Sequence, residues 1–151
     1  INIFGYHFAS LDIRQDSSIH NKVFHKILTL IFDSKTSDNY SVMSDDEKIN
    51  FISKVNFLNK KTPYKDKDLI NTLGSIEAMK SIQKSNGIPG SHRYIISHNQ
   101  SPLNILEVFN MFLFTGWTKP SVDIVPLFET IDDLNISESV MEKVYQNKLY
   151  I

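Results

Sequence analysis

Residues 93–114, RYIISHNQSPLNILEVFNMFLF, decide the fold of this chain. The stretch begins with a short apolar run, residues 93–97, whose two isoleucines and tyrosine predict a buried strand. Ser101 and Pro102 follow, and a capping serine with proline at the first helical position marks the start of a helix. That helix, residues 103–114, is apolar on almost every side, which indicates burial by several neighbours. A strand followed closely by such a helix is typical of parallel βα units.

The segments on both sides of this stretch repeat the order of strand and helix. Downstream, residues 122–128 form another apolar run, and Thr130 with Asp133 can cap a last helix. Upstream, the apolar residues between 3 and 13 predict a strand covered on both faces, which ends in the polar residues 12–16. Three helices are expected between the first two strands. Their signals are a cap at Asp16 or Ser17, a capping box that begins at Ser44, and an apolar stripe from Leu69 to Ile82 that closes near Asn86 and Gly87.

These elements predict an α/β fold with about three parallel strands and about five helices. The polar residues 34–40 and the residues 59–67, which include Pro63, are expected to be loops. Right-handed crossovers make the strands point the same way. Three such strands leave both edges of the sheet uncovered, so we expect a helix-rich partial segment of a TIM-like βα barrel. No linker divides the sequence, and residues 1–151 are expected to be a single segment of that barrel.

Polar residues gather where each expected strand ends, at positions 12–16, 97–100 and 129–133. The carboxyl ends of parallel strands share one edge of the sheet. That edge is where barrels and open parallel sheets build their sites. We therefore expect the three groups to meet at a common rim.

Two charged residues in these groups are candidates for chemistry. The guanidinium of Arg14 can bind a phosphate or carboxylate through two parallel hydrogen bonds, and a structural ion pair with Asp12 or Asp16 is the alternative. Glu129 is a candidate ligand for Mg²⁺ or Mn²⁺, which prefer hard oxygen donors. Its alternative role is structural, because the macrodipole favours an anion near the start of a helix.

The composition excludes several classes of function. There are 16 Lys and Arg against 17 Asp and Glu, a net charge of −1, which predicts binding to neither nucleic acid nor an anionic membrane. Cysteine is absent, which excludes disulfides, thiolate metal sites and cysteine nucleophiles. No apolar run approaches the ~18–20 residues that span a bilayer. We therefore expect a cytoplasmic globular protein.

The five histidines are not expected to assemble a site. His20 and His25 leave a helix about 140° apart, and six strand residues separate His92 from His98 by roughly 20 Å. Neither pair can chelate one ion. His20 alone is placed near the rim, and the other four are expected to be surface or packing residues.

Three blocks of the sequence resemble phosphoenolpyruvate carboxylases. They are Leu11-Asp12-Ile13-Arg14-Gln15, Tyr94-Ile95-Ile96-Ser97 and Leu127-Phe128-Glu129-Thr130-Ile131-Asp132-Asp133-Leu134, in the order of the family and with compatible spacing. The first and third blocks are specific, and the resemblance covers essentially the whole chain. It departs from the family at Leu103-Asn104, where Ser-Asp is common. Because members of the family are several times longer, the resemblance implies an internal segment of the catalytic barrel.

The resemblance implies a carbon–carbon lyase. Such an enzyme combines phosphoenolpyruvate with bicarbonate to give oxaloacetate and inorganic phosphate, through carboxyphosphate and an enolate, with Mg²⁺ or Mn²⁺. It implies that Glu129 is a metal ligand and that Arg14 neutralises anionic groups of the substrate. The expected partners are these small molecules, with neither nucleic acid nor membrane, and the parent enzyme is expected to be a homo-oligomer.

Other blocks of the family do not occur in the chain. These are Gly-Tyr-Ser-Asp-Ser, with the second metal carboxylate, and Thr-Ala-His-Pro-Thr, with the catalytic histidine. We therefore expect the chain alone to be inactive and not to bind the metal ion tightly. The alternative is a non-catalytic helical interaction or scaffold domain that reuses this barrel segment. Away from the barrel, the apolar helix 103–114 and the open strand edges should find partners, so we expect either self-association or a rearranged, helix-dominated core.

Overall fold

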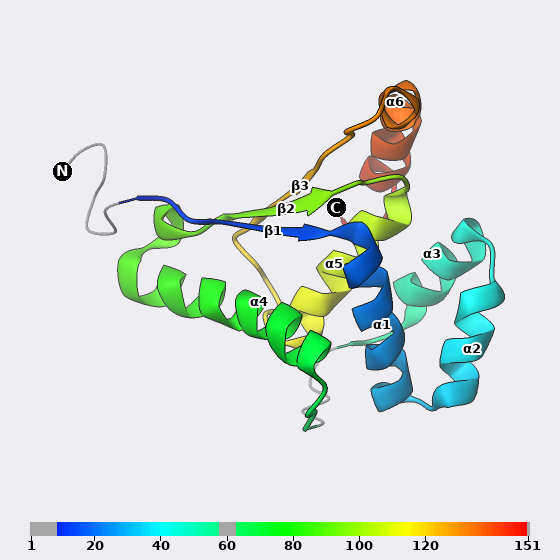
Figure 1. Ribbon diagram of the computed structural model, residues 1–151, viewed down its shortest axis with the longest axis horizontal. Coiled ribbons are helices and arrows are strands. Elements are labelled where there is room, and N and C mark those ends of the chain that lie inside the picture. Colours follow the sequence, from blue (N-terminus) through cyan, green and yellow to red (C-terminus); the bar gives the residue numbers. More distant parts are fainter. Residues whose placement is uncertain (1–8, 58–62, 151) are drawn as a thin grey trace.

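The computed structural model describes residues 9–57 and 63–150, and its centre is a parallel sheet (Figure 1). The sheet has the order β1-β2-β3, with β1 at Asp12–Asp16, β2 at Arg93–Ser97 and β3 at Asp123–Pro126. Asp16 pairs with Ser97, and Ile96 pairs with Pro126. The three strands therefore finish at nearly the same level, which brings their carboxyl ends to one edge as predicted.

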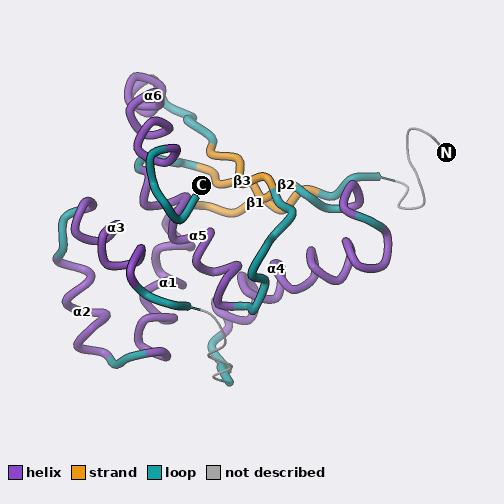
Figure 2. The backbone as a smooth tube through the Cα atoms, turned by 180° about the vertical axis from the view of Figure 1, so that it is seen from behind, coloured by secondary structure: helices purple, strands orange, loops and turns teal. Residues whose placement is uncertain are grey.

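The described residues also form six α-helices, arranged in layers. In both Figure 1 and Figure 2, α1, α4 and α5 lie on one side of the sheet, with α2 and α3 beyond them, and α6 lies past the carboxyl ends of the strands, where it contacts α5. The helices are α1 (Ser17–Ile31), α2 (Ser34–Val42), α3 (Asp45–Lys54), α4 (Lys67–Asn86), α5 (Pro102–Phe114) and α6 (Ile131–Tyr145). The predicted α/β class and parallel strands are confirmed. In the described ranges no helix is both long and apolar enough to cross a membrane.

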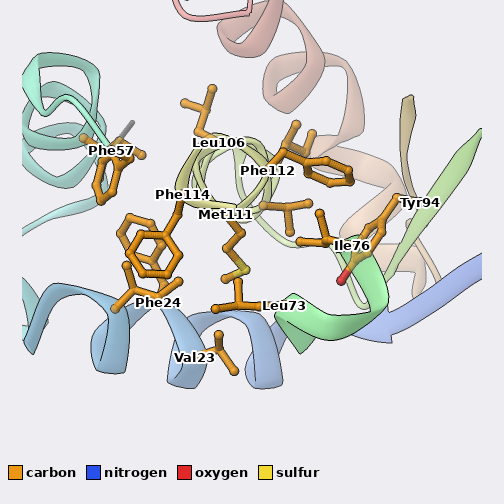
Figure 3. Close-up of a cluster of buried hydrophobic side chains, with 14 of the residues drawn as sticks. Val23, Phe24, Phe57, Leu73, Ile76, Tyr94, Leu106, Met111, Phe112 and Phe114 are labelled. Atoms are coloured by element: carbon orange, nitrogen blue, oxygen red, sulfur yellow. The ribbon is translucent and has the colours of Figure 1, made fainter. Parts of the chain in front are cut away.

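Helix α5 is the centre of the core, as its all-round apolar sequence predicts. Ten of its 13 residues are buried. Figure 3 shows side chains from α1, α4 and β2 converging on it. The labelled residues of this cluster are Val23, Phe24, Phe57, Leu73, Ile76, Tyr94, Leu106, Met111, Phe112 and Phe114. Because neighbouring helices already cover α5, it is not the exposed surface that we expected to drive self-association. The large exposed apolar side chains include Ile131, Leu134 and Tyr145 on α6 instead.

The local start and stop signals are confirmed at several helices. Asp16 caps α1, and Ser44 forms a capping box with Glu47 at the start of α3. Ser101 caps α5 ahead of its proline, and Gly87 ends α4 with φ of +87°. At such a φ a residue with a Cβ is strained, so glycine fits the end of this helix.

The expectation of a loop at residues 34–40 was wrong, because these residues form most of α2. The segment is too polar to show a helical stripe. Its helix depends on an Asp33 cap, whose carboxylate accepts from the Thr36 N–H at 2.6 Å, and on burial of Tyr40 among other aromatic rings. Tertiary packing thus overrides weak local propensity here. Of the second expected loop, residues 59–62 lie outside the described residues, 63–66 have no regular structure, and Lys67 is the first residue of α4.

The first strand is placed later than predicted. The strand was expected over the apolar residues 3–13, with the polar residues 12–16 only at its end, whereas residues 12–16 form β1. Residues 1–8, which carry most of the expected apolar strand, lie outside the described residues. Polar residues are tolerated in β1 because Ile13 packs against the core and the Gln15 amide donates to the Thr72 hydroxyl at 3.0 Å.

Candidate functional site

Four charged or ionisable side chains meet at the carboxyl ends of the strands. They are Arg14, Asp16, His98 and Glu129, which we call the rim cluster. Arg14 and Asp16 belong to β1, His98 directly follows β2, and Glu129 lies between β3 and α6. Residues up to 115 positions apart in sequence are thereby joined by hydrogen bonds. The predicted meeting of the three polar groups at one rim is confirmed.

Arg14 is held by the ends of both other strands. Its Nη2 donates to Glu129 Oε1 at 2.8 Å, and its Nε donates to Ser97 Oγ at 2.7 Å. The alternative partners that the sequence left open are engaged elsewhere, since Asp12 pairs with Arg93 at 3.0 Å and Asp16 with His98. The Arg14 side chain is 56% exposed, so part of the guanidinium still faces solvent. The two candidates from the sequence therefore contact each other directly.

The carboxylate of Glu129 has one donor on each oxygen. Besides the Arg14 bond to Oε1, Oε2 accepts from the backbone N–H of His98 at 2.8 Å. The start of α6 is satisfied without Glu129, because Thr130 and Asp133 form the capping box that was predicted for it. The side chain of Glu129 thus contacts Arg14 and His98.

His98 is the residue of this cluster that the sequence did not reveal. Its Nδ1 lies 2.8 Å from Asp16 Oδ2 and 3.7 Å from Glu129 Oε2. The only signal was its place in the polar group 97–100, and spacing arguments between histidines cannot detect a partner from another strand. His20, which we expected near the rim, is buried in the core with its Nε2 3.0 Å from the Tyr94 hydroxyl.

Contacts within the cluster favour the charged forms of Asp16 and His98. Hydrogen bonds from the Ser18 hydroxyl and N–H, and then from His98, lower the pKa of Asp16 to about 2. The hydrogen bond with Asp16, followed by the charge of Glu129, raises the pKa of His98 above its usual value. By contrast, burial lowers the pKa of His20 to about 4. Two carboxylates at the rim are therefore balanced by a guanidinium and an imidazole that is readily protonated.

The rim offers only part of a metal site. Glu129 supplies the oxygen donor that Mg²⁺ and Mn²⁺ prefer, and Mg²⁺ is often bound through one or two carboxylates together with substrate oxygens. However, no group of three or more histidine or acidic side chains is arranged to hold a metal ion in the ranges 9–57 and 63–150. A divalent ion bound at Glu129 would therefore need ligands beyond the carboxylates of the rim.

The parallel sheet and its helices place this chain among the α/β proteins. In that class, enzymes commonly build their sites from side chains at the carboxyl ends of the strands, where the rim cluster lies. Comparison with known proteins identifies the family within this class. The family model for phosphoenolpyruvate carboxylase matches residues 1–151, and the chain belongs to this family.

Curated relatives match over nearly the whole chain but are much longer. The chain is 36% and 32% identical to phosphoenolpyruvate carboxylases of Prochlorococcus marinus strains MIT 9312 and AS9601, and 28% identical to that of Trichormus variabilis. Each match covers 99% of this chain, whereas the chain spans only 15–16% of the length of these relatives.

Proposed function

We propose that this chain is part of a phosphoenolpyruvate carboxylase and contributes Arg14 and Glu129 to its active site. The observation that carries the proposal is the 2.8 Å ion pair between these two side chains at the carboxyl edge of the sheet. The family match and the names of the relatives support the same reaction. The parent would be a cytoplasmic lyase that joins phosphoenolpyruvate and bicarbonate, giving oxaloacetate and phosphate, and the described fold would be a piece of its βα barrel.

Arg14 would bind and orient an anionic group of the substrate. Its guanidinium is half exposed and is already fixed by Ser97 and Glu129, so little side-chain freedom is lost when an anion binds. A fixed positive charge next to a phosphate or carboxylate also stabilises negative charge that grows on those oxygens during reaction. Because arginine cannot lose its proton in proteins, this role is the same across the physiological pH range.

Glu129 would act through its position beside Arg14. The divalent ion implied by the family, Mg²⁺ or Mn²⁺, would be held in part by Glu129 and would supply additional positive charge near the substrate oxygens. When a substrate anion approaches Arg14, it competes with the Glu129 carboxylate for the same guanidinium. Until the substrate binds, the ion pair with Glu129 would hold the Arg14 guanidinium in place at the rim.

The chain alone is expected to be inactive. One carboxylate and one arginine form an incomplete site, and the other sequence blocks that the family uses do not occur in it. An assay of the 151-residue chain with Mg²⁺, bicarbonate and phosphoenolpyruvate should show no oxaloacetate. Oxaloacetate formation above background would contradict this expectation.

The role of Arg14 is best tested in a chimera. Residues 1–151 would replace the matching segment of the 36% identical Prochlorococcus marinus enzyme. We expect the folded chimera to form oxaloacetate and the Arg14→Gln variant to lose about a hundredfold or more in rate, as when a charge-stabilising donor is removed from an active site. Lys22→Gln is the matched control, because Lys22 is an exposed cation that pairs with Asp68. If both variants retain the rate, Arg14 has no role in the reaction.

A further inference from the structure

His98 has an unusual backbone conformation at the rim. Among the described residues it is the one non-glycine with a positive φ, which is +50°. This left-handed conformation costs free energy for a residue with a Cβ, so it persists only where surrounding contacts require it. Three contacts do so. The His98 N–H donates to Glu129, its carbonyl accepts from the Ser17 hydroxyl at 2.7 Å, and the following N–H, of Asn99, donates to the Leu127 carbonyl at 3.0 Å.

The ring of His98 lies between two carboxylates that come from different strands. Nδ1 is 2.8 Å from Asp16 Oδ2 and 3.7 Å from Glu129 Oε2. Asp16 comes from the end of β1 and Glu129 from the turn after β3. One imidazole nitrogen therefore approaches both carboxylates, while the Arg14 guanidinium bonds to the other oxygen of Glu129.

Two carboxylates that approach one point are also what a hard divalent cation requires. A cation bound to Glu129 would be strengthened by a second nearby carboxylate, but here Asp16 is already engaged by the imidazole. The ring bonds Asp16 Oδ2 and lies near Glu129 Oε2, and a cation would approach the same two oxygens, so each would weaken the binding of the other.

We propose that His98 is a positioning residue that ties Asp16 to Glu129 and thereby limits how tightly these two carboxylates bind a divalent cation. The inference rests on the proposed function in one respect, namely that Glu129 takes part in cation binding. It adds two residues, Asp16 and His98, and a direction for the effect of each. Removal of the ring strengthens cation binding, and removal of the Asp16 charge weakens it.

The variant His98→Gly tests the contribution of the ring separately from that of the backbone. Glycine adopts a φ of +50° without strain and retains the N–H that bonds Glu129, so this variant removes only the imidazole. His98→Asn is the conservative variant, because asparagine tolerates the left-handed region and its amide can still donate to Asp16. Asp16→Asn removes the charge but preserves the cap of α1, since asparagine and aspartate are equally good N-caps.

The experiment is a titration of the 151-residue chain with Mn²⁺ at neutral pH, in which free Mn²⁺ is measured by electron paramagnetic resonance. Circular dichroism would confirm the fold of each variant. We expect His98→Gly to bind Mn²⁺ about fivefold more tightly than the unmodified chain, a change of the size that an exposed pair of charges supports. His98→Asn should remain close to the unmodified chain. Adding Asp16→Asn to His98→Gly should abolish the gain.

Two outcomes separate this inference from the proposed function. If Glu129→Gln weakens Mn²⁺ binding but His98→Gly leaves the affinity unchanged or lower, the role of His98 is refuted and that of Glu129 stands. If Glu129→Gln leaves the affinity unchanged, the metal role of Glu129 fails, and the inference fails with it.

Discussion

The rim cluster and the interior of the helical layer both contain carboxylates. The pKa of Asp16 at the rim and that of Glu107 in the interior are shifted in opposite directions. At the rim, Asp16 accepts several hydrogen bonds and lies beside His98, so its pKa falls to about 2. In the interior, Glu107 of α5 is fully buried, and burial raises its pKa to about 7. The Tyr40 hydroxyl and the Asn21 amide donate to Glu107 Oε1, at 2.9 and 3.3 Å, while Oε2 has no hydrogen-bond partner among the described residues.

The difference separates two kinds of polar group in this chain. The rim carboxylates are partly exposed and are matched by opposite charges, so they can exchange partners with an incoming ion. Glu107 contacts only neutral donors, and its buried position gives a ligand no direct access. We therefore interpret the rim as functional and the group of Glu107, Tyr40 and Asn21, the buried cluster, as part of the core.

The largest expected effect comes from the charge of Glu107. Its folded pKa is raised to about 7 from an ordinary value of 4.5, so its contribution to stability is fully present below pH 4.5 and is lost as the pH rises to about 7. Glu107→Gln does not titrate. The free energy of unfolding of this variant, relative to the unmodified chain, should therefore increase by on the order of 3 kcal/mol across that range. Urea denaturation at a series of pH values measures it, and a difference that does not vary with pH would refute the assignment.

His20 should produce the opposite pH dependence. Burial lowers its folded pKa to about 4 from 6.5, so its contribution is fully present above pH 6.5 and is lost as the pH falls towards 4. In the Glu107→Gln background, the free energy of unfolding should fall by roughly 2–3 kcal/mol over this range. Replacing His20 with Gln in the same background should flatten the curve. An unchanged slope would mean that another group is responsible.

Tyr40→Phe should have a smaller effect, confined to the buried cluster. The substitution removes the 2.9 Å donor from a carboxylate that has few partners, which costs about 1–3 kcal/mol. The loss should be greater at pH 8 than at pH 5, because the ionised carboxylate needs the donor more. Tyr145→Phe, at an exposed tyrosine of α6, is the matched control. Equal losses for the two variants, or a loss independent of pH, would contradict this account.

The smallest effect on stability is expected at the rim. The ion pair of Arg14 and Glu129 is partly exposed, with 56% and 30% of the two side chains accessible, and such pairs contribute about 1 kcal/mol or less. Glu129→Gln should therefore change the thermal midpoint of the chain only slightly. A loss as large as that of Tyr40→Phe would mean that the rim cluster is mainly structural.

The sequence predicts elements well where the signals are local. The strand at residues 93–97, the cap at Ser101 and the end of α4 at Gly87 depend on side chains within a few positions, and all three lie where expected. Arg14 and Glu129 were chosen as candidates because strand ends can be read from apolar runs and because the family blocks mark them. Their contact with each other follows from the order of parallel strands.

Features that depend on distant residues were missed. Helix α2 has a polar sequence, and burial of Tyr40 against residues from α1 and α3 stabilises it. The place of His98 in the cluster requires a left-handed backbone and partners from β1 and from beyond β3. Neither requirement can be recognised from the neighbouring residues in the sequence. Boundaries such as that of β1 also depend on pairing with β2 rather than on apolar pattern.

The most direct test compares one carboxylate from each cluster in the Prochlorococcus marinus chimera. The measurement is the rate of oxaloacetate formation by Glu129→Gln and by Glu107→Gln, with circular dichroism to confirm that both fold. The account predicts that Glu129→Gln loses about a hundredfold or more, as expected for removal of a group that organises charge in the site, while Glu107→Gln keeps the rate of the unmodified chimera. Equal rates for the two variants, or a greater loss for Glu107→Gln, would contradict the assignment of the rim as the functional site.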